Sequence, residues 1–376
     1  MSVIVKPIPA TKEALKKFVQ FGIDHYKGND YFVPPLLMDD VNTLLPEGNP
    51  AFDFCEAQCF MAYRDGKPVG RIAAIINNVV NERTGKNVVR FGFVEFIDDA
   101  EVVDALFDAV EKWGKERGMN QITGPLGFTD MDYEGMLIEG FDQLGTMATI
   151  YNYPYYPAHM ERRGMEKEAD WVEYLMPIPP EVPEKHKRIA EIVKKKFNLH
   201  VAKVKSRKEL KEKYGLALFQ VINKAYDRLY GYSPLTDRQI EHYIKLYLGL
   251  IKLDNICVIV DADDKLVGVG ISVPSFSRAL QKSGGHLWPL GWRHFIKPMF
   301  GTVDTVDLLL VAIDPDYQGK GVNALLFTEL IPAFNRLGYK QAESNPELES
   351  NENVQKQWEY FERRQHKRRR SFTKAI

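Results

Sequence analysis

The residues with the clearest chemical potential lie between positions 305 and 323. The apolar stretch TVDLLLVAI runs into Asp314-Pro315, then into Gln318-Gly319-Lys320-Gly321, and directly into an amphipathic segment. A strand that turns through glycines into a helix leaves unpaired backbone N–H groups and the positive end of the helix dipole aimed at one point. This pattern predicts an anion site with a phosphate or pyrophosphate as its ligand.

Two common nucleotide-binding motifs do not match this turn. A P-loop needs Gly, four residues and then Gly-Lys-Ser/Thr, whereas residues 316–323 read DYQGKGVN. A dinucleotide fingerprint needs three glycines early in the chain and an acidic residue on the next strand, and neither is present here.

The turn resembles the acyl-coenzyme A loop of the GNAT acyltransferases, in which Arg or Gln is followed by two residues, Gly, one residue, and Gly or Ala. Gln318 to Gly321 match this form, and Asn323 stands where Gly or Ala is usual. The resemblance implies direct transfer of an acyl group from acetyl-coenzyme A or another acyl-coenzyme A to a small-molecule amine acceptor, without a metal. It implies that the co-substrate is held by Gln318, Gly319, Lys320, Gly321, Val322 and Asn323, with the backbone of Leu310, Val311, Ala312 and Ile313 along the thioester.

The same resemblance suggests the catalytic residues. GNAT enzymes often carry a carboxylate on the strand before the loop, which makes Asp307 the candidate base. The alternative is that Asp307 is simply a solvated residue at the start of a strand. They commonly carry Tyr seven residues after an Asn, which Tyr360 and Asn353 satisfy. The same spacing counted from Asn351 reaches Trp358, which is not a useful proton donor. Which asparagine occupies the family position therefore decides whether Tyr360 is the candidate acid. Asn353 is expected either to bond the pantetheine arm or to cap a helix.

The elements that must position these residues occur twice along the chain. Each half reads as a strand, a helix, a hairpin, a further strand with its helix, and closing strands; the hairpins turn at Asp65-Gly66 and at Asp263-Asp264. The expected elements include strands over 121–128 and 201–205 and helices over 236–251 and 353–364. Ser206, with Glu209 three residues later, predicts a capping box at a further helix start. We therefore expect an α/β (α+β) protein with two GNAT-like domains, residues 1–178 and 179–376, each a mixed, mostly antiparallel twisted sheet flanked by helices. The proline-rich segment 177–185 contains the expected boundary.

The first half carries no glycine turn at the equivalent position. Asp98-Asp99-Ala100-Glu101 stands there instead. Carboxylates repel a pyrophosphate, so the N-terminal copy is expected to be degenerate and the C-terminal copy to bind the co-substrate.

Composition narrows the class of protein. The chain has 50 Lys and Arg residues and 51 Asp and Glu residues, so its formal net charge is -1. This charge argues against a protein whose whole surface binds nucleic acid. Cys55, Cys59 and Cys257 form neither a disulfide framework nor a zinc pattern and are expected in the core. The first residues lack a secretory pattern, so a cytoplasmic location is expected.

Two segments remain after the family pattern is accounted for. Residues 277–302 separate strands that a minimal GNAT domain joins by a tight turn, and they mix Trp288, Trp292 and Phe300 with Arg293 and Lys297. They are suited to covering an apolar acyl chain or acceptor, to contacting lipid headgroups through residues 286–300, or to packing on the N-terminal domain. The basic tail from Arg363 to Arg370 is expected to meet an acidic surface with half its side chains.

The sequence thus predicts an acyl-coenzyme A N-acyltransferase. The alternative is a non-catalytic relative that senses acyl-coenzyme A or binds a partner through the aromatic insertion.

Overall fold

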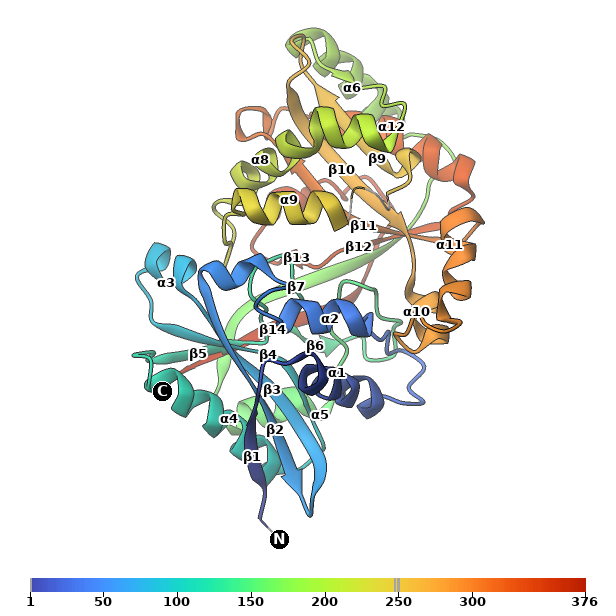
Figure 1. Ribbon diagram of the computed structural model, residues 1–376. Helices are drawn as coiled ribbons and strands as arrows, with labels where there is room; N and C mark the ends of the chain where they lie inside the picture. The colour runs from blue at the N-terminus through green and yellow to red at the C-terminus, as the bar shows by residue number, and fades with distance from the viewer. Residues whose placement is uncertain (1, 247, 249–250) are drawn as a thin grey trace. The chain divides into compact units, whose positions relative to one another are not determined.

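The computed structural model describes residues 2–246, 248 and 251–376, and Figure 1 shows its ribbon. The chain divides into two compact units. Unit 1 comprises the chain up to Val172 with Phe276–Ile296 and His366–Ile376, and unit 2 comprises Glu173–Ser275 and Lys297–Gln365. Among the helices described, none has the length and apolar character needed to cross a membrane.

Unit 1 is built on a mixed sheet with the strand order β1-β2-β3-β4-β5-β14. All neighbouring pairs are antiparallel except the parallel pair β4 and β5. The β2–β3 hairpin turns at Asp65 and Gly66, which both have positive φ, as the sequence predicts. The strand bounds are Ile4–Ile8 (β1), Cys55–Arg64 (β2), Lys67–Asn77 (β3), Val88–Phe96 (β4), Gln121–Gly124 (β5) and Arg364–Ala375 (β14), with Met136–Glu139 (β6) paired to β14.

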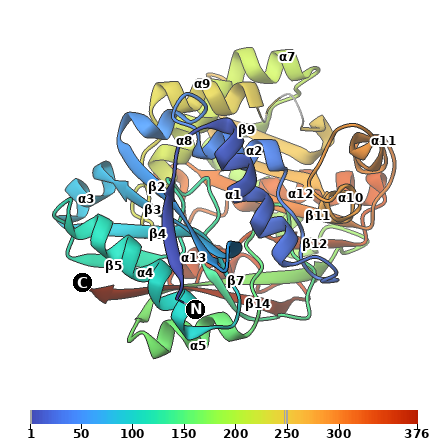
Figure 2. The ribbon, with the colours of Figure 1, turned by 60° about the horizontal axis from the view of Figure 1, so that its bottom comes forward.

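Helices cover both faces of this sheet, and Figure 2 shows α1 and α4 on opposite sides of β2 and β3. One core packs α4 and α5 against residues such as Phe91 and Ile72. The other core packs α1 and α2 against the opposite face and contains Cys55 and Cys59. The helices of unit 1 are Lys12–His25 (α1), Leu37–Leu44 (α2), Asn78–Thr84 (α3), Ala100–Lys115 (α4), Tyr155–Arg162 (α5) and Ser277–Ser283 (α10), with short 3-10 turns at Pro50–Asp53 and Gly291–Phe295.

Unit 2 repeats the arrangement with the strand order β8-β9-β10-β11-β12-β7. The pairs are again antiparallel except for one, the parallel pair β11 and β12. Its strands are His200–Val201 (β8), Ile256–Val260 (β9), Leu266–Pro274 (β10), Thr305–Ile313 (β11), Gln341–Ser344 (β12) and Glu347–Leu348 (β13), with Glu166–Pro177 (β7) entering from unit 1. The prediction of two copies of one mixed α/β arrangement is confirmed.

The helices of unit 2 lie on both faces of its sheet. One core packs α6 and α12 against the sheet and includes Cys257, so all three cysteines are buried, as predicted. Helix α8 packs on β10 and β11. The helices are Glu184–Phe197 (α6), Arg207–Glu209 (α7), Gly215–Tyr226 (α8), Asp237–Leu246 (α9), Ile296–Phe300 (α11), Asn323–Leu337 (α12) and Glu352–Lys356 (α13), with a π-helical turn at Leu210–Tyr214 and 3-10 turns at Leu253–Asn255 and Pro315–Tyr317.

Each unit receives its closing strand from the other half of the sequence. In unit 1, β14 from the C-terminus pairs with β5, with Phe372 opposite Gly124. In unit 2, the end of β7 pairs with β12, with Leu175 opposite Glu343. The compact units do not divide at the expected boundary 178/179, because unit 1 includes segments that follow it and unit 2 begins before it, at Glu173. The two predicted sequence domains therefore stay a prediction.

A bulge occurs at the same place in both sheets. In unit 1 the register between β3 and β4 shifts next to Phe93, whose φ is 46°. In unit 2 the register between β10 and β11 shifts at Leu309. Beyond each bulge the parallel partner is lost, since pairing of β4 with β5 ends at Arg90 and pairing of β11 with β12 ends at Leu308. Each sheet therefore opens between its two parallel strands.

Several predicted bounds differ from the structure. The strand expected over 121–128 ends at Gly124, and the one expected over 201–205 is only His200–Val201. The helix expected over 236–251 is α9, Asp237–Leu246, and its remainder includes Tyr247, Gly249 and Leu250, which lie outside the described residues. Helices α2 and α6 are not foreseen by the sequence reading.

The helix expected over 353–364 is wrong beyond Lys356. Trp358 is buried, and its indole N–H donates to the Glu347 carboxylate at 2.7 Å. Its ring also contacts those of Phe327 and Phe361. These tertiary contacts hold residues 357–361 in turns rather than in a continuous helix.

Candidate active site

The glycine turn in unit 2 joins β11 to α12. Asp314 begins it, and one of its carboxylate oxygens accepts from the N–H of Asp316 at 3.1 Å. Gly319 and Gly321 have φ values of 70° and 81°, which side chains disfavour. An added Cβ at Gly321 would also lie 2.8 Å from a methyl of Ile189, so this glycine lets the turn approach α6.

The start of α12 leaves backbone donors available. Its N-cap residue, Val322, provides no side-chain acceptor. Within the described residues, the N–H groups of Gly319, Gly321, Val322 and Asn323 have no protein acceptor. Unpaired donors at the positive end of a 15-residue helix form a site for an anion.

A cavity of about 480 Å³ adjoins this turn within unit 2. The side chains of Lys196 and Lys320 supply positive charge to it. The ammonium of Lys320 lies 5.5 Å from the ring centre of Phe197 and 5.8 Å from that of Tyr317. The rest of the lining is mainly apolar and consists of Ile189, Ile192, Val193 and Phe197, with Gly319. Free N–H groups, two lysines and an apolar wall fit the phosphates and the less polar parts of coenzyme A.

The corresponding helix start in unit 1 is closed by its own side chain. Asp99 is the N-cap of α4 and accepts from the N–H groups of Glu101 and Val102 at 3.0 and 3.3 Å. Arg64 binds the same carboxylate at 2.7 and 3.1 Å. The hydrogen bond from Arg64 and those from the backbone lower the pKa of Asp99 to about 2. The donors that a pyrophosphate would need are therefore already used by a carboxylate.

The predicted thioester segment, Leu310 to Ile313, lies where β11 has lost its parallel partner. Tyr226 of α8 donates to the Val311 carbonyl at 2.9 Å. Asn345, just after β12, donates from its N–H to the Leu308 carbonyl at 3.1 Å and from its side chain to the Leu309 carbonyl at 3.1 Å. The two Asn345 bonds fix the distance between β11 and the end of β12, and the Tyr226 bond fixes β11 to α8.

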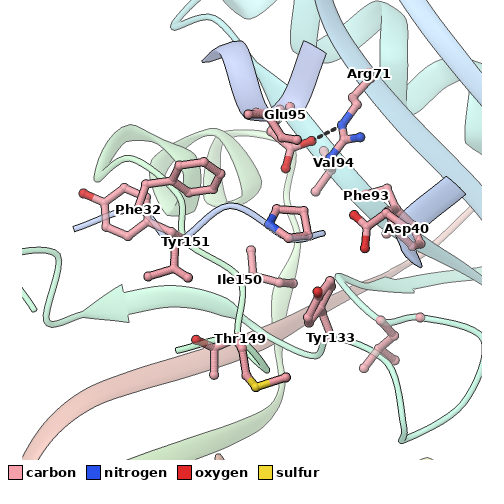
Figure 3. Close-up of a pocket in the computed structure, with 18 residues that line it drawn as sticks. Phe32, Asp40, Arg71, Phe93, Val94, Glu95, Tyr133, Thr149, Ile150 and Tyr151 are labelled. Carbon is pink, nitrogen blue, oxygen red and sulfur yellow. Dashed lines mark hydrogen bonds and ion pairs between the residues drawn. The ribbon is translucent and has the colours of Figure 1, made fainter. Parts of the chain in front are cut away.

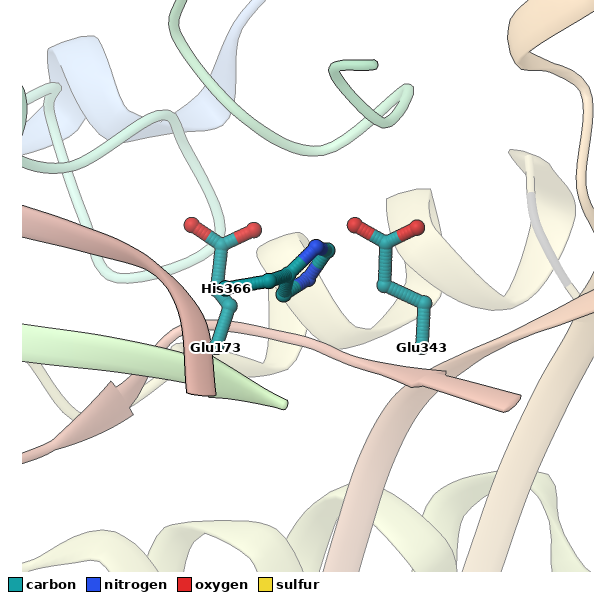
Figure 4. A group of neighbouring side chains, drawn as sticks. All are labelled: Glu173, Glu343 and His366. Atoms are coloured by element: carbon teal, nitrogen blue, oxygen red, sulfur yellow. The ribbon is translucent and has the colours of Figure 1, made fainter. Parts of the chain in front are cut away.

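Asp307 lies at the paired part of β11 and is 3% exposed. It stands opposite Glu343 on β12. Figure 4 shows Glu343 with Glu173 of β7, and oxygens of these two buried carboxylates lie within 4.8 Å of each other. His366, also drawn there, belongs to unit 1. Two carboxylates are fewer ligands than magnesium or calcium usually takes, so we assign no metal to unit 2 from this pair.

Tyr360 lies outside any helix, and Asn353 lies within the short α13. The Tyr360 side chain is 52% exposed, and the Lys185 ammonium lies 3.5 Å from its ring centre. The helix cap is Asn351, whose side chain accepts from the N–H of Val354 at 3.4 Å. The seven-residue spacing between Asn353 and Tyr360 therefore does not describe one helical face, and their functional roles remain predictions.

Glu347 is a candidate functional residue that the sequence reading missed. Burial raises the pKa of its carboxyl to about 7, against the lowering effects of the Trp358 hydrogen bond and of Arg363. It follows Asn345 by two residues, next to the opening between β11 and β12. The sequence signal for it is weak: it is a glutamate three residues after the end of the strand 341–344, and many surface glutamates share such a position.

The insertion belongs to unit 1 up to Ile296. The Gln281 side chain donates to the carbonyls of Asp30 and Phe32 at 2.9 Å each. Leu37 donates from its N–H to the Gly285 carbonyl at 3.0 Å. Of the expectations for this segment, packing on the N-terminal half is therefore confirmed for residues 276–296.

The basic tail forms β14. Arg370 binds the buried carboxylate of Asp170 at 2.8 and 3.0 Å, and Arg368 reaches the same carboxylate at 3.2 Å. Part of the tail thus meets an acidic group inside unit 1, as expected.

No family model matches the chain. Among curated proteins, it is 28% identical to Protein YghO of Escherichia coli (strain K12) over 375 residues, or 97% of this chain and 94% of that protein. It is 27% identical to the bacterial ceramide synthase of Caulobacter vibrioides over 293 residues, or 78% of this chain and 74% of that protein.

Two solved structures with this architecture are GCN5-related (GNAT) acetyltransferase-fold proteins. A tandem GNAT protein from the clavulanic acid biosynthesis pathway aligns with a TM-score of 0.57 and 11% identity, covering 100% of this chain and 98% of that one. A glucosamine N-acetyltransferase region of a fungal multi-domain enzyme aligns with a TM-score of 0.55 and 14% identity, covering 99% of this chain and 38% of that one. The chain therefore has the tandem GNAT fold over its full length, and the predicted fold resemblance is confirmed.

Proposed function

We propose that this protein, which has the tandem GNAT fold, transfers an acyl group from an acyl-coenzyme A held in unit 2 to an amine. The observation that carries the proposal is the difference between the two helix starts. Asp99 occupies the donors of α4, whereas those of α12 have no acceptor in the described part of the chain and adjoin a cavity with two lysines. Only the second arrangement suits a pyrophosphate.

Direct transfer requires a base, an acid and a binding site for the thioester oxygen. The acceptor must lose a proton before its nitrogen attacks the thioester carbonyl carbon; the C–S bond then breaks, and the thiolate takes up a proton. A carboxylate with a pKa of about 7 can accept that first proton near neutral pH, which makes Glu347 our leading base. Asp307 remains the second candidate base and Tyr360 the candidate acid. Backbone along Leu310 to Ile313 would bind the thioester oxygen.

The relative named bacterial ceramide synthase guides the choice of acceptor. A ceramide is the amide of a fatty acid and a long-chain amino alcohol. We therefore propose an amine with a long apolar chain as the acceptor class and a long-chain acyl-coenzyme A as the donor.

The exposed insertion supports an acceptor of that kind. Residues 265–303 contain no Asp or Glu, while the insertion carries Arg278, Lys282, Arg293 and Lys297. Its exposed apolar side chains are Leu287, Trp288, Leu290, Trp292, Ile296 and Phe300, and Trp288 and Phe300 are each 80% exposed. Exposed indoles with cations and no anions favour a surface of anionic lipid headgroups, so we propose peripheral membrane contact through residues 286–300.

A non-catalytic acyl-coenzyme A sensor is the second candidate. It is favoured by the placement of Tyr360 outside a helix and by Asn323 at the position where the family loop has Gly or Ala.

Turnover separates the two candidates. Release of free thiol from palmitoyl-coenzyme A in the presence of sphinganine, measured with a thiol reagent, is expected for the transferase. Calorimetry with coenzyme A tests the site itself: Lys320→Glu should abolish the heat, while Lys203→Glu, on an exposed lysine of unit 2, should preserve it. Absence of coenzyme A binding by the folded wild type would overturn both candidates. Binding without thiol release across a panel of amines would favour the sensor.

A further inference from the structure

Unit 1 contains a cavity at the place where β4 and β5 separate. Its volume is about 60 Å³, enough for a few water-sized groups, and it is not fully enclosed. Figure 3 shows side chains from β3, β4 and α2 around it, together with Phe32, Tyr133 and residues 149–151 from the loops. The walls are mainly apolar and include Ile23, Phe32, Val33, Val94, Leu126, Met147 and Ile150. Because α4 is capped by Asp99, this cavity does not serve a coenzyme A pyrophosphate bound to unit 1.

Three lining residues of this cavity carry charge. Arg71 and Glu95 form a buried ion pair on β3 and β4, and Arg71 also donates to the Phe18 carbonyl at 2.9 Å. Their charges cancel. The third charged residue, Asp40 of α2, therefore leaves the cavity with an excess of one negative charge when it is ionised.

Asp40 is buried without a partner. It is 5% exposed, and among the residues that the structure describes its carboxylate has neither a hydrogen bond nor an ion pair. Figure 3 shows this carboxylate turned into the cavity. A buried carboxylate without a partner is unfavourable, and an occupant that donates hydrogen bonds and carries positive charge would relieve the penalty.

The charged groups around Asp40 also favour a positively charged occupant. Burial raises its pKa to about 7, and Glu95, Asp39 and Asp132 add to the rise, while Arg71 alone among the named neighbours opposes it. Asp132, on the loop after β5, is itself raised to a pKa of about 6, mainly by burial. Tyr133 and Tyr151 supply the remaining titratable groups on the wall. The surroundings of Asp40 are thus short of positive charge.

The cavity wall is also joined to the insertion. Phe32 and Val33 line the cavity, and the carbonyl of Phe32 accepts from Gln281 of α10. The same insertion exposes Trp288 and Trp292 farther along the chain. The segment that carries Phe32 and Val33 on the cavity wall is therefore hydrogen-bonded to the insertion within unit 1.

We propose that unit 1 contains a binding site for a protonated primary amine with an unbranched apolar arm, whose ammonium group is bound by Asp40. The ammonium supplies three donors and one positive charge to a carboxylate that has no other partner. The apolar walls then select an alkylammonium over a small polar amine. This site does not depend on acyl transfer in unit 2.

Calorimetry with hexylammonium tests the site on the full-length protein without coenzyme A. We expect saturable binding at pH 8, at least tenfold tighter than binding of either hexanol, which lacks the charge, or methylammonium, which lacks the apolar arm. Asp40 must be ionised to bind the cation, so binding should be about tenfold weaker at pH 6 than at pH 8, given its pKa of about 7. A hexanol affinity equal to that of hexylammonium would overturn the proposal.

Variants isolate the carboxylate. Asp40→Asn should reduce hexylammonium affinity at least tenfold, whereas Glu47→Gln, at an exposed acid after α2 that is not among the charges named as acting on Asp40, should leave it unchanged. Thermal unfolding checks that both variants are folded. If Asp40→Asn does not fold, the wild-type pH dependence decides: affinity that is equal at pH 6 and pH 8 overturns the assignment to Asp40. Retained binding by a folded Asp40→Asn variant would also overturn it.

Discussion

Arg64 and Asp99 form a two-point ion pair at the start of α4, with N–O distances of 2.7 and 3.1 Å. The same carboxylate caps the helix, so one side chain fills the place where the other copy of the fold has a glycine turn. The difference between the units therefore lies in which group satisfies the first backbone donors of a helix.

Removing this cap should weaken unit 1 and spare unit 2. Asp99→Ala deletes the hydrogen bonds to Glu101 and Val102, and we expect it to lower the free energy of unfolding by about 1–2 kcal/mol. Because the pKa of Asp99 is lowered to about 2, its stabilising effect is present above the ordinary value of 3.8 and is lost as the pH falls towards 2. Denaturant unfolding at pH 7 and at pH 2.5 should show a clearly smaller mutational difference at the lower pH.

The coenzyme A affinity of the same variant tests which unit holds the co-substrate. Asp99→Ala should not change it, because the proposed site lies in unit 2. A large change in affinity, in either direction, would argue that unit 1 takes part in binding the co-substrate.

The glycines of the unit 2 turn should differ in importance. Both have positive φ, so each Gly→Ala change costs about 1 kcal/mol in backbone strain. At Gly321 the new methyl would also lie 2.8 Å from Ile189, whereas at Gly319 it would meet nothing within 4 Å. We expect Gly321→Ala to weaken coenzyme A binding by more than tenfold and Gly319→Ala by severalfold, as measured by calorimetry. Equal losses would indicate that the contact with α6 does not shape the site.

Much of this architecture follows from local sequence, and the reason is visible in particular residues. Asp65-Gly66 and the Ser206/Glu209 cap act within a few positions, so the hairpin and the helix start are readable; Ser206 indeed accepts from the Glu209 N–H at 3.1 Å. The exchange of β7 and β14 depends on pairing between distant segments, which periodicity does not encode. Likewise, Asp40 becomes notable only because it is buried, and Glu347 only because its surroundings raise its pKa. Residues 357–361 leave the helix because Trp358 is held by Glu347.

Glu347 should control the pH dependence of turnover if it is the base. Burial raises its pKa to about 7, and only the carboxylate form accepts a proton, so kcat/KM should rise with pH through 7. Glu347→Gln should lower kcat by about 100-fold or more and remove this rise, with coenzyme A affinity unchanged. Asp307→Asn is the comparison: if it, rather than Glu347→Gln, removes the rise, Asp307 is the base.

The insertion should bind anionic membranes through its indoles. Trp288 and Trp292 are 80% and 45% exposed, and replacing both by alanine removes two large apolar groups from the proposed contact. We expect the double variant to partition about tenfold or more less strongly into vesicles of phosphatidylglycerol and phosphatidylcholine in a sedimentation assay. Binding of the wild type should weaken at high salt, since Arg293 and Lys297 act through screened charge. Leu216→Ala, at a 51% exposed residue of unit 2, is the matched control and should bind as the wild type does. Equal partitioning of the double variant and the wild type would exclude the insertion as the membrane contact.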